Sequence, residues 1–292
     1  MKTEKNILIA FLLNLLFSII EVIGGLATNS IAIISDSIHD IGDALSIGVS
    51  YFLERKSSKK PDDKYTYGYV RYSVLGSIIT TFILLGSSIL VIYNAILRLY
   101  NPSEIDYDGM MIFAILGVVN NFLAGYYTRN GNSLNQKSVN LHMLEDVLGW
   151  VAVLIGALIM KFTDIRIIDP ILSIGVALFI FINSLKNLKE IVDIFLEKTP
   201  NNIDIEKIKE CLLGINGVVD VHHIHIRSID GINNYATMHI VLDCDYKKVK
   251  IKIKEELEKC GISHTTIEFE EKDEVCDSQK CETKNLKHHH HH

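Results

Sequence analysis

Two long apolar stretches of this sequence each contain a His–Asp pair. His39 and Asp43 lie in one stretch, and His142 and Asp146 lie in the other. The members of each pair are four positions apart, so both project from one face of an α-helix. Imidazole nitrogen and carboxylate oxygen both bind divalent metal ions. The two pairs together offer a tetrahedral set of two nitrogens and two oxygens, which suits Zn²⁺ and is tolerated by Co²⁺ or Cd²⁺.

The apolar surroundings of these residues bear on two interpretations. An ionisable group at the centre of a bilayer costs about 3 kcal/mol, so it normally faces a bundle interior or a water-filled path. A single His–Asp pair fits a structural hydrogen bond between helices as well as a metal site. Because the pair is repeated, we favour a metal site.

Three acidic residues lie next to the two pairs. Asp36 and Asp40 fall near the helix face of the first pair. We expect them to line the access path or to hydrogen-bond to a metal ligand and hold its orientation. Glu145 lies about 100° around its helix from Asp146, so it is left out of the metal set.

The elements that carry these pairs are predicted to be membrane-spanning helices. Six apolar stretches approach or exceed the roughly 20 residues that a helix needs to cross a bilayer. Lys and Arg near their ends number thirteen on one side and three on the other, which predicts that both termini are cytoplasmic. A signal peptide is the weaker interpretation of the first stretch, because five more follow. The stretches are residues 7–27, 31–53, 73–99, 110–127, 139–160 and 168–185.

The composition changes near residue 200. Of the first 199 residues 34 are charged, against 30 of the last 93. Residues 1–199 are therefore predicted to be a six-span transmembrane domain. Residues 200–275 show helical and strand periods in the order αββαβ, which predicts a C-terminal cytoplasmic α+β domain with a three-stranded sheet. Residues 276–292 are a Cys-containing tail that ends in a run of His typical of a purification tag.

Several classes of function receive no support. The formal net charge of −6 argues against nucleic-acid binding. No G-x-x-x-x-G-K-[ST] motif occurs, so coupling to ATP is unsupported. No nucleophile is paired with a base in the apolar stretches, and we do not expect an enzyme. The five Cys residues all follow residue 200, which fits a reducing, cytosolic compartment better than a disulfide framework.

A hairpin in the C-terminal domain brings two histidines together. The Asp230-Gly231 dipeptide is a strong signal for a two-residue turn. If the residues that flank it pair with each other, His222 faces His239 on the next strand. Such cross-strand neighbours have Cβ atoms about 4.5–5.5 Å apart, close enough to share one Zn²⁺.

The same register has consequences for other candidate ligands. In this register His223 and His225 point to the other face of the sheet. A turn centred on residues 231–234 would shift the register, and this alternative stays open. Cys276 and Cys281 are separated by four residues, at the long end of zinc-ligand spacing, and form a further candidate pair.

The whole pattern resembles the cation diffusion facilitator family. The resemblance rests on both His–Asp pairs and on Asp36, Pro61-Asp62-Asp63, Tyr67-Gly68-Tyr69, Arg71 and Asp169-Pro170. In that family the two pairs form the transport site, and the His-Asp, His-Asp composition is similar to the zinc-transporting branch. The manganese branch uses Asp pairs instead. The resemblance also implies six spans, followed by a metal-binding-like cytoplasmic domain that forms a homodimer.

Two further expectations follow from the resemblance. It adds His264 to the cytoplasmic site of His222 and His239. Some relatives carry another metal site between the second and third spans, with histidines near the Tyr-Gly motif. Here the matching positions hold Tyr65 and Tyr69, so we expect a solvated loop without a metal site.

Together these patterns predict a secondary transporter in the plasma (inner) membrane that exports Zn²⁺ from the cytoplasm in exchange for protons. Metal ligands must be deprotonated, so Zn²⁺ and H⁺ compete for the same four side chains. One alternative is efflux of another divalent metal: Cd²⁺, Co²⁺, Fe²⁺ or Mn²⁺. Another is a membrane-anchored metal sensor or buffer, which the Cys and His content of the tail suggests. The expected partners are divalent metal ions, the lipid bilayer and a second copy of the chain, with cytosolic Zn²⁺ tightening the dimer.

Overall fold

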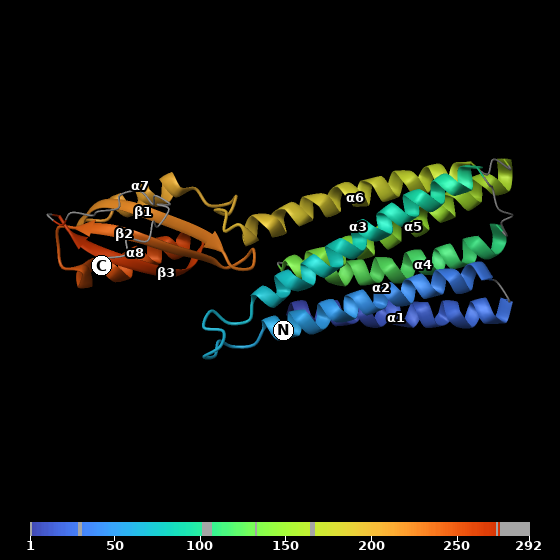
Figure 1. Cartoon of the computed structure of the whole chain (residues 1–292), viewed down its shortest axis with the longest axis horizontal. Coiled ribbons are helices and arrows are strands. Elements are labelled where there is room, and N and C mark those ends of the chain that lie inside the picture. The colour runs from blue at the N-terminus through green and yellow to red at the C-terminus, as the bar shows by residue number, and fades with distance from the viewer. Residues whose placement is uncertain are drawn as a thin grey trace, which may run out of the picture. The chain divides into compact units, whose positions relative to one another are not determined.

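The computed structural model describes residues 2–28, 31–100, 107–131, 133–163, 167–272 and 274. For residues 24–28 and 31–39, and for a few other positions within helices, it describes the backbone alone. The chain forms two compact units, Met1–Asp193 and Ile194–His292. Each unit is described by itself below, and Figure 1 labels the elements of both.

Within the described ranges, six long helices make up the membrane part of the chain (Figure 1). All six predicted apolar stretches lie inside these helices. Most helices continue into polar residues, because a backbone hydrogen-bond ladder does not end where hydropathy falls. Their bounds are Lys2–Thr28 for α1, Ile31–Ser57 for α2, Arg71–Tyr100 for α3, Tyr107–Thr128 for α4, Leu134–Thr163 for α5 and Ile168–Phe195 for α6.

Four helices, α1, α3, α4 and α5, are long and apolar enough over their described residues to cross a membrane. Helices α2 and α6 are not among them. The sequence of α2 includes five ionisable residues in its first 24 positions, which lower its mean hydropathy: Asp36, His39, Asp40, Asp43 and Glu54. The first His–Asp pair is among these five residues.

The membrane part exposes apolar side chains and buries polar ones. Leu16, Phe52, Phe82 and Phe122 are each more than half exposed on the outside of their helices. Hydroxyl and amide side chains, by contrast, are buried between helices. This arrangement is unfavourable in water but suits a hydrocarbon solvent, so this part is an integral membrane domain.

The helices that carry the His–Asp pairs are fixed by contacts with their neighbours. Helix α1 packs against α2 and α4, and α5 packs against α3 and α4. A cluster of buried apolar residues joins α1, α2, α4 and α5; its members are Ile7, Ala10, Ile47, Ala124, Val139 and Met143. Because Ile47 lies one turn from Asp43 and Met143 follows His142, this cluster fixes the depth at which Asp43 and His142 meet.

Trp150 of α5 fills the contact with α1 and α4. Its ring meets the Phe17 ring edge-on, with 5.9 Å between the ring centroids. It also covers Gly117 so closely that a Cβ atom there would lie 2.5 Å from Trp150 Cδ2. The absence of a side chain at Gly117 therefore lets the backbones of α4 and α5 approach each other.

The second unit has the αββαβ order that the sequence predicts. Its strands form a sheet in the order β1-β2-β3 among the described residues, with β1 and β2 antiparallel and β2 and β3 parallel. Helix α8 connects the two parallel strands, as such a pair requires. The bounds are Ile205–Leu213 for α7, Val218–Ser228 for β1, Asn234–Leu242 for β2, Tyr246–Lys259 for α8 and Ile262–Glu271 for β3.

Alternation along β2 separates a core face from an open face. Ala236, Met238 and Ile240 are buried in a core that includes Leu212 of α7 and Ile253 of α8. The residues between them point the other way, because successive side chains of a strand lie on opposite faces. The open face is therefore free to carry polar and ionisable groups.

The packing of Trp150 on Gly117 generates a stability prediction. Gly117→Ala should destabilise the membrane domain by about 1–3 kcal/mol, because the added methyl group forces Trp150 or the helix backbones apart. The measurement is the midpoint of thermal unfolding in detergent. Gly86→Ala is the matched control, because a Cβ atom at Gly86 meets nothing within 4 Å. Equal midpoints for the two variants would contradict the close contact.

Candidate metal sites

Asp43, His142 and Asp146 meet between helices α2 and α5. The Nε2 atom of His142 is 3.6 Å from Asp43 Oδ1. One potential ligand atom from each of the three residues lies within 4.8 Å of the other two. Zn²⁺ binds such atoms at about 2.0–2.2 Å, so the three groups can reach one ion with small side-chain movements.

The surroundings of His142 fit a cationic ligand. The side chain is buried, and neither ring nitrogen has a hydrogen-bond partner among the described residues. A buried polar atom without a partner costs about 1–3 kcal/mol. A divalent cation bound between His142 and the two carboxylates would remove that cost and balance their negative charge.

Glu145 lies closer to this cluster than sequence reasoning allowed. Its Oε2 atom is 3.9 Å from His142 Nδ1. Its Oε1 atom accepts long hydrogen bonds from Ser87 and Ser88 of α3, at 3.4 and 3.5 Å. The position three residues after His142 was the available signal, because residues i and i+3 are also neighbours on a helix. Glu145 thus lies beside the His142 ring without a hydrogen bond to it, and outside the three-residue cluster.

The remaining candidates near the first pair divide into two groups. The side chains of Asp36 and His39 lie outside the described residues, so their predicted roles remain predictions. Asp40 is half-buried and close enough to Asp146 to interact with it electrostatically. That position is compatible with the access-path or supporting role that we predict for it.

Strands β1 and β2 pair His222 with His239, as predicted, but not through the predicted turn. A two-residue turn would pair Ile229 with residue 232, whereas β1 ends by pairing Ser228 with Asn234. The longer loop shifts the register by one residue. A β-bulge between His222 and His225 shifts it back.

The bulge also places the His223 side chain on a different face of the sheet from the predicted one. This residue has a φ angle of +53°, in the left-handed region that few non-glycine residues adopt. Its ring stacks on the His239 ring with 4.8 Å between centroids, and it meets the His225 ring at 4.9 Å. The prediction that His223 faces away from His239 is therefore wrong, because the extra residue interrupts the strand's alternation.

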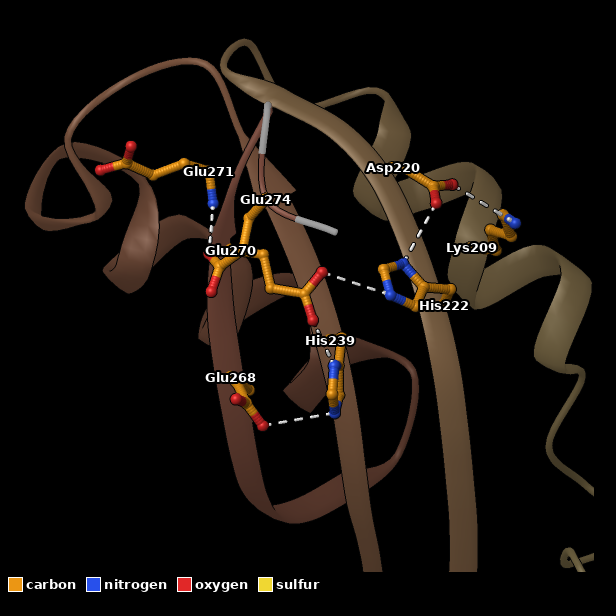
Figure 2. Close-up of polar contacts among 8 residues, drawn as sticks. All are labelled: Lys209, Asp220, His222, His239, Glu268, Glu270, Glu271 and Glu274. Carbon is orange, nitrogen blue, oxygen red and sulfur yellow. Dashed lines mark hydrogen bonds and ion pairs between the residues drawn. The ribbon is translucent and has the colours of Figure 1, made fainter. Parts of the chain in front are cut away.

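Three carboxylates surround the His222–His239 pair. Figure 2 shows Glu270 between the two rings: its Oε2 atom is 3.3 Å from His222 Nε2, and its Oε1 atom contacts His239 Nδ1. Asp220 Oδ2 is 3.2 Å from His222 Nδ1, and Glu268 Oε2 is 3.4 Å from His239 Nε2. Ligand atoms of His222, His239 and Glu270 lie within 4.8 Å of one another. Each imidazole is thus oriented by a carboxylate on its far side.

Charge supports a cation at this second cluster. Three carboxylates meet two imidazoles, and Glu270 is buried, with 6% of its surface exposed. Lys209 offsets part of the charge from outside, at 3.6 Å from Asp220. Sequence reasoning missed Glu268 and Glu270, although their alternation on the last strand was a usable signal for one sheet face.

His264 lies away from this cluster. It pairs with Tyr235 in the register of β2 and β3, and the two rings are 4.9 Å apart. Glu268, the partner of His239, is four positions further along β3, which corresponds to about 13 Å. The grouping of His264 with His222 and His239 is therefore wrong, and Glu270 takes that place. Cys276 and Cys281 lie outside the described residues.

Asp62 organises the loop between α2 and α3. Its Oδ1 atom accepts backbone N–H bonds from Lys64 and Tyr65, at 3.1 and 2.9 Å. Its Oδ2 atom accepts from the Tyr69 hydroxyl at 2.7 Å and from Lys59 Nζ at 3.1 Å. The Tyr69 hydrogen bond, helped by these others, holds the pKa of the Asp62 carboxyl well below its usual range. Both oxygens are committed to the loop itself.

These observations define a class of protein: an integral membrane domain with a buried His–carboxylate cluster, joined to an αββαβ domain with a second such cluster. Residues 7–196 match the family described as cation efflux transmembrane domain. Residues 200–272 match the family described as cation efflux protein, cytoplasmic domain. The chain therefore belongs to the cation diffusion facilitator family, as its motifs predict.

Similar proteins cover nearly the whole chain. It is 34% identical over 301 residues to the cadmium, cobalt and zinc/H(+)-K(+) antiporter of Bacillus subtilis, which covers 99% of this chain and 97% of the relative. It is 32% identical over 293 residues to the zinc transporter ZitB of Pectobacterium atrosepticum, with 98% and 91% covered. Metal cation efflux system protein CzcD of Cupriavidus metallidurans is 31% identical over 273 residues, with 91% and 86% covered.

The hydrogen bonds of Asp62 generate a binding prediction. The double variant Asp62→Asn with Asp63→Asn should bind as many Zn²⁺ ions per chain as the parent, because Asp62 already uses both oxygens within the loop. The variant Asp43→Ala should bind one fewer. Equilibrium dialysis with metal analysis measures both ratios. Loss of one Zn²⁺ from the loop variant would reveal a metal site there.

Proposed function

We propose that this protein exports divalent metal ions, with Zn²⁺ as the main substrate, in exchange for protons. The observation that carries the proposal is the buried cluster of Asp43, His142 and Asp146 inside a membrane domain. The printed names of the relatives support it, because one is a cadmium, cobalt and zinc/H(+)-K(+) antiporter and another a zinc transporter. We include His39 as a fourth ligand on its spacing from Asp43 alone.

Exchange follows from competition for the same atoms. Imidazole and carboxylate must lose their protons before they bind a divalent metal ion. Protons that bind to these ligands therefore displace the metal ion, and loss of the protons restores the site. A bundle that alternates between inward and outward openings loads Zn²⁺ from the cytoplasm and releases it when protons bind from the other side.

Donor chemistry sets the expected metal range. A ligand set of imidazole nitrogen and carboxylate oxygen favours Zn²⁺ and tolerates Cd²⁺ and Co²⁺. Fe²⁺ and Mn²⁺ are weaker candidates, since Mn²⁺ prefers a set richer in oxygen. The distribution of Lys and Arg supports an orientation with both termini in the cytoplasm, and we propose the plasma (inner) membrane as the location.

The second cluster supports a regulatory role for the C-terminal domain. We assign one divalent cation to His222, His239 and Glu270, because their ligand atoms converge beside two further carboxylates. In a homodimer, cytosolic Zn²⁺ bound there would tighten the association of the two domains. The same cluster is the observation in favour of a second candidate function, that of a membrane-anchored metal sensor or buffer.

The transport proposal is tested by flux. In proteoliposomes with an imposed pH gradient, the parent should move Zn²⁺, and Asp43→Ala or His142→Ala should lower the initial rate at least about tenfold, because each removes a ligand. Asp63→Asn is the control, since it changes a carboxylate of the exposed loop. Parent-like flux in the Asp43 and His142 variants would refute the site assignment.

The cytoplasmic cluster is tested by separating binding from flux. The double variant His239→Ala with Glu270→Gln should bind one Zn²⁺ fewer per chain, and His264→Ala should bind as many as the parent. Flux at saturating Zn²⁺ should stay within about threefold of the parent, because the transport ligands are intact. Loss of a Zn²⁺ ion from His264→Ala would refute the assigned ligands. Abolished flux in the double variant would show that the cluster is required for transport, and absent flux in the parent would favour the sensor function.

A further inference from the structure

Asp43, His142 and Asp146 form the proposed transport cluster. A line of buried polar side chains extends along α2 from this cluster. Ser46, Ser50 and Glu54 follow Asp43 at intervals of three and four residues, and all are buried. This spacing places them on one helix face. The hydroxyl of Ser46 has no hydrogen-bond partner among the described residues. Glu54 lies eleven residues from Asp43, about 16 Å along the helix axis.

Helix α5 carries a second line of buried polar residues. Asn135 and Ser138 are buried and precede His142 by seven and four residues. The two lines meet at both ends. At one end His142 Nε2 lies 3.6 Å from Asp43 Oδ1, and at the other the Asn135 amide donates a hydrogen bond of 3.1 Å to Glu54 Oε2.

Side chains of α3 and α6 join the two lines between these ends. The Ser50 and Thr80 hydroxyls are 2.6 Å apart. The Asn187 amide of α6 donates hydrogen bonds to Thr81 at 2.7 Å and to Ser138 at 2.8 Å. We call this set the polar track: Asp43, Ser46, Ser50, Thr80, Thr81, Asn135, Ser138, His142 and Asn187, with Glu54 at its far end.

Glu54 is the acidic residue of the polar track that has no place in the transport cluster. It is 6% exposed. In the described part of the chain, no Lys, Arg or His side chain forms a salt bridge with it; its neighbour Arg55 lies 3.8 Å from Glu4 instead. A buried carboxylate whose partner is a neutral amide is costly unless a cation or proton reaches it.

We propose that Glu54 is a transient binding residue for the divalent cation, which it receives from the cytoplasm and passes along the polar track to Asp43, His142 and Asp146. The proposal rests on the transport function proposed above. A single carboxylate holds a divalent ion weakly, and weak binding is what a passage site needs, since the ion must leave as readily as it arrives. While no ion is bound, the Asn135 amide donates a hydrogen bond to the Glu54 carboxylate.

The test is the zinc dependence of flux by the full chain in proteoliposomes, with Zn²⁺ varied on the side of the α2 C-terminus. Glu54→Gln should raise KM for Zn²⁺ about tenfold, the factor that corresponds to about 1.4 kcal/mol, and should leave equilibrium Zn²⁺ binding at the transport cluster unchanged. Glu54→Asp keeps the charge and should hold KM within about threefold of the parent. Glu4→Gln removes a carboxylate next to Arg55 but outside the polar track, and should leave KM unchanged.

Two results would overturn the proposal. One is a KM in Glu54→Gln that stays within about threefold of the parent. The other is equal impairment of Glu54→Gln and Glu54→Asp, which would indicate a packing role. Asp43→Ala distinguishes failure of the transport proposal from failure of the Glu54 proposal. If Asp43→Ala transports like the parent, the proposed function itself fails. If Asp43→Ala is inactive while Glu54→Gln has a normal KM, only the role of Glu54 fails.

If Glu54→Gln does not fold, Glu54→His decides the question together with Glu54→Asp. Both variants keep a side chain that can bind a divalent metal ion at this position. A KM within about threefold of the parent in both variants supports a binding role for this position. A tenfold rise in both variants means that Glu54 is needed for packing, which overturns the proposal.

Discussion

Ionisable side chains inside a bilayer are stable when they face one another or a cation, and this requirement holds α2 and α5 together at Asp43 and His142. The apolar cluster that includes Ile47 and Met143 sets the depth of the contact. Trp150 over Gly117 fixes α4 against α5. The lipid-facing surface is apolar, so the polar interior has no alternative partner outside the bundle.

The same constraint extends beyond the contact of Asp43 with His142. Buried hydroxyls and amides on α2, α3, α5 and α6 satisfy one another through side-chain hydrogen bonds such as Ser50–Thr80 and Asn187–Ser138. In a membrane protein such bonds join helices without help from the hydrophobic effect. They also leave a polar interior along which a cation is less costly to move than it would be in hydrocarbon.

The C-terminal domain places similar ligands on a different scaffold. There a sheet supplies them from three neighbouring strands, one residue each from β1, β2 and β3, on the face that the helices leave open. The pairing of His222 with His239 depends on a longer loop and a compensating bulge. The bulge also brings His223 against His239. A one-residue shift in either feature would turn one imidazole away from the other.

The sequence by itself determined the helices, the αββαβ order and the residues of the membrane cluster, because these depend on local periods and on spacings within one helix. His142 and Asp146 had to share a face at a spacing of four. The contacts of Glu145 with Ser87 and Ser88 of α3, the replacement of His264 by Glu270, and the pairing of Glu54 with Asn135 were decided by the tertiary structure alone. Each joins residues through loop length, strand register or helix rotation, and those quantities are set by packing across the whole domain rather than by neighbours in the chain.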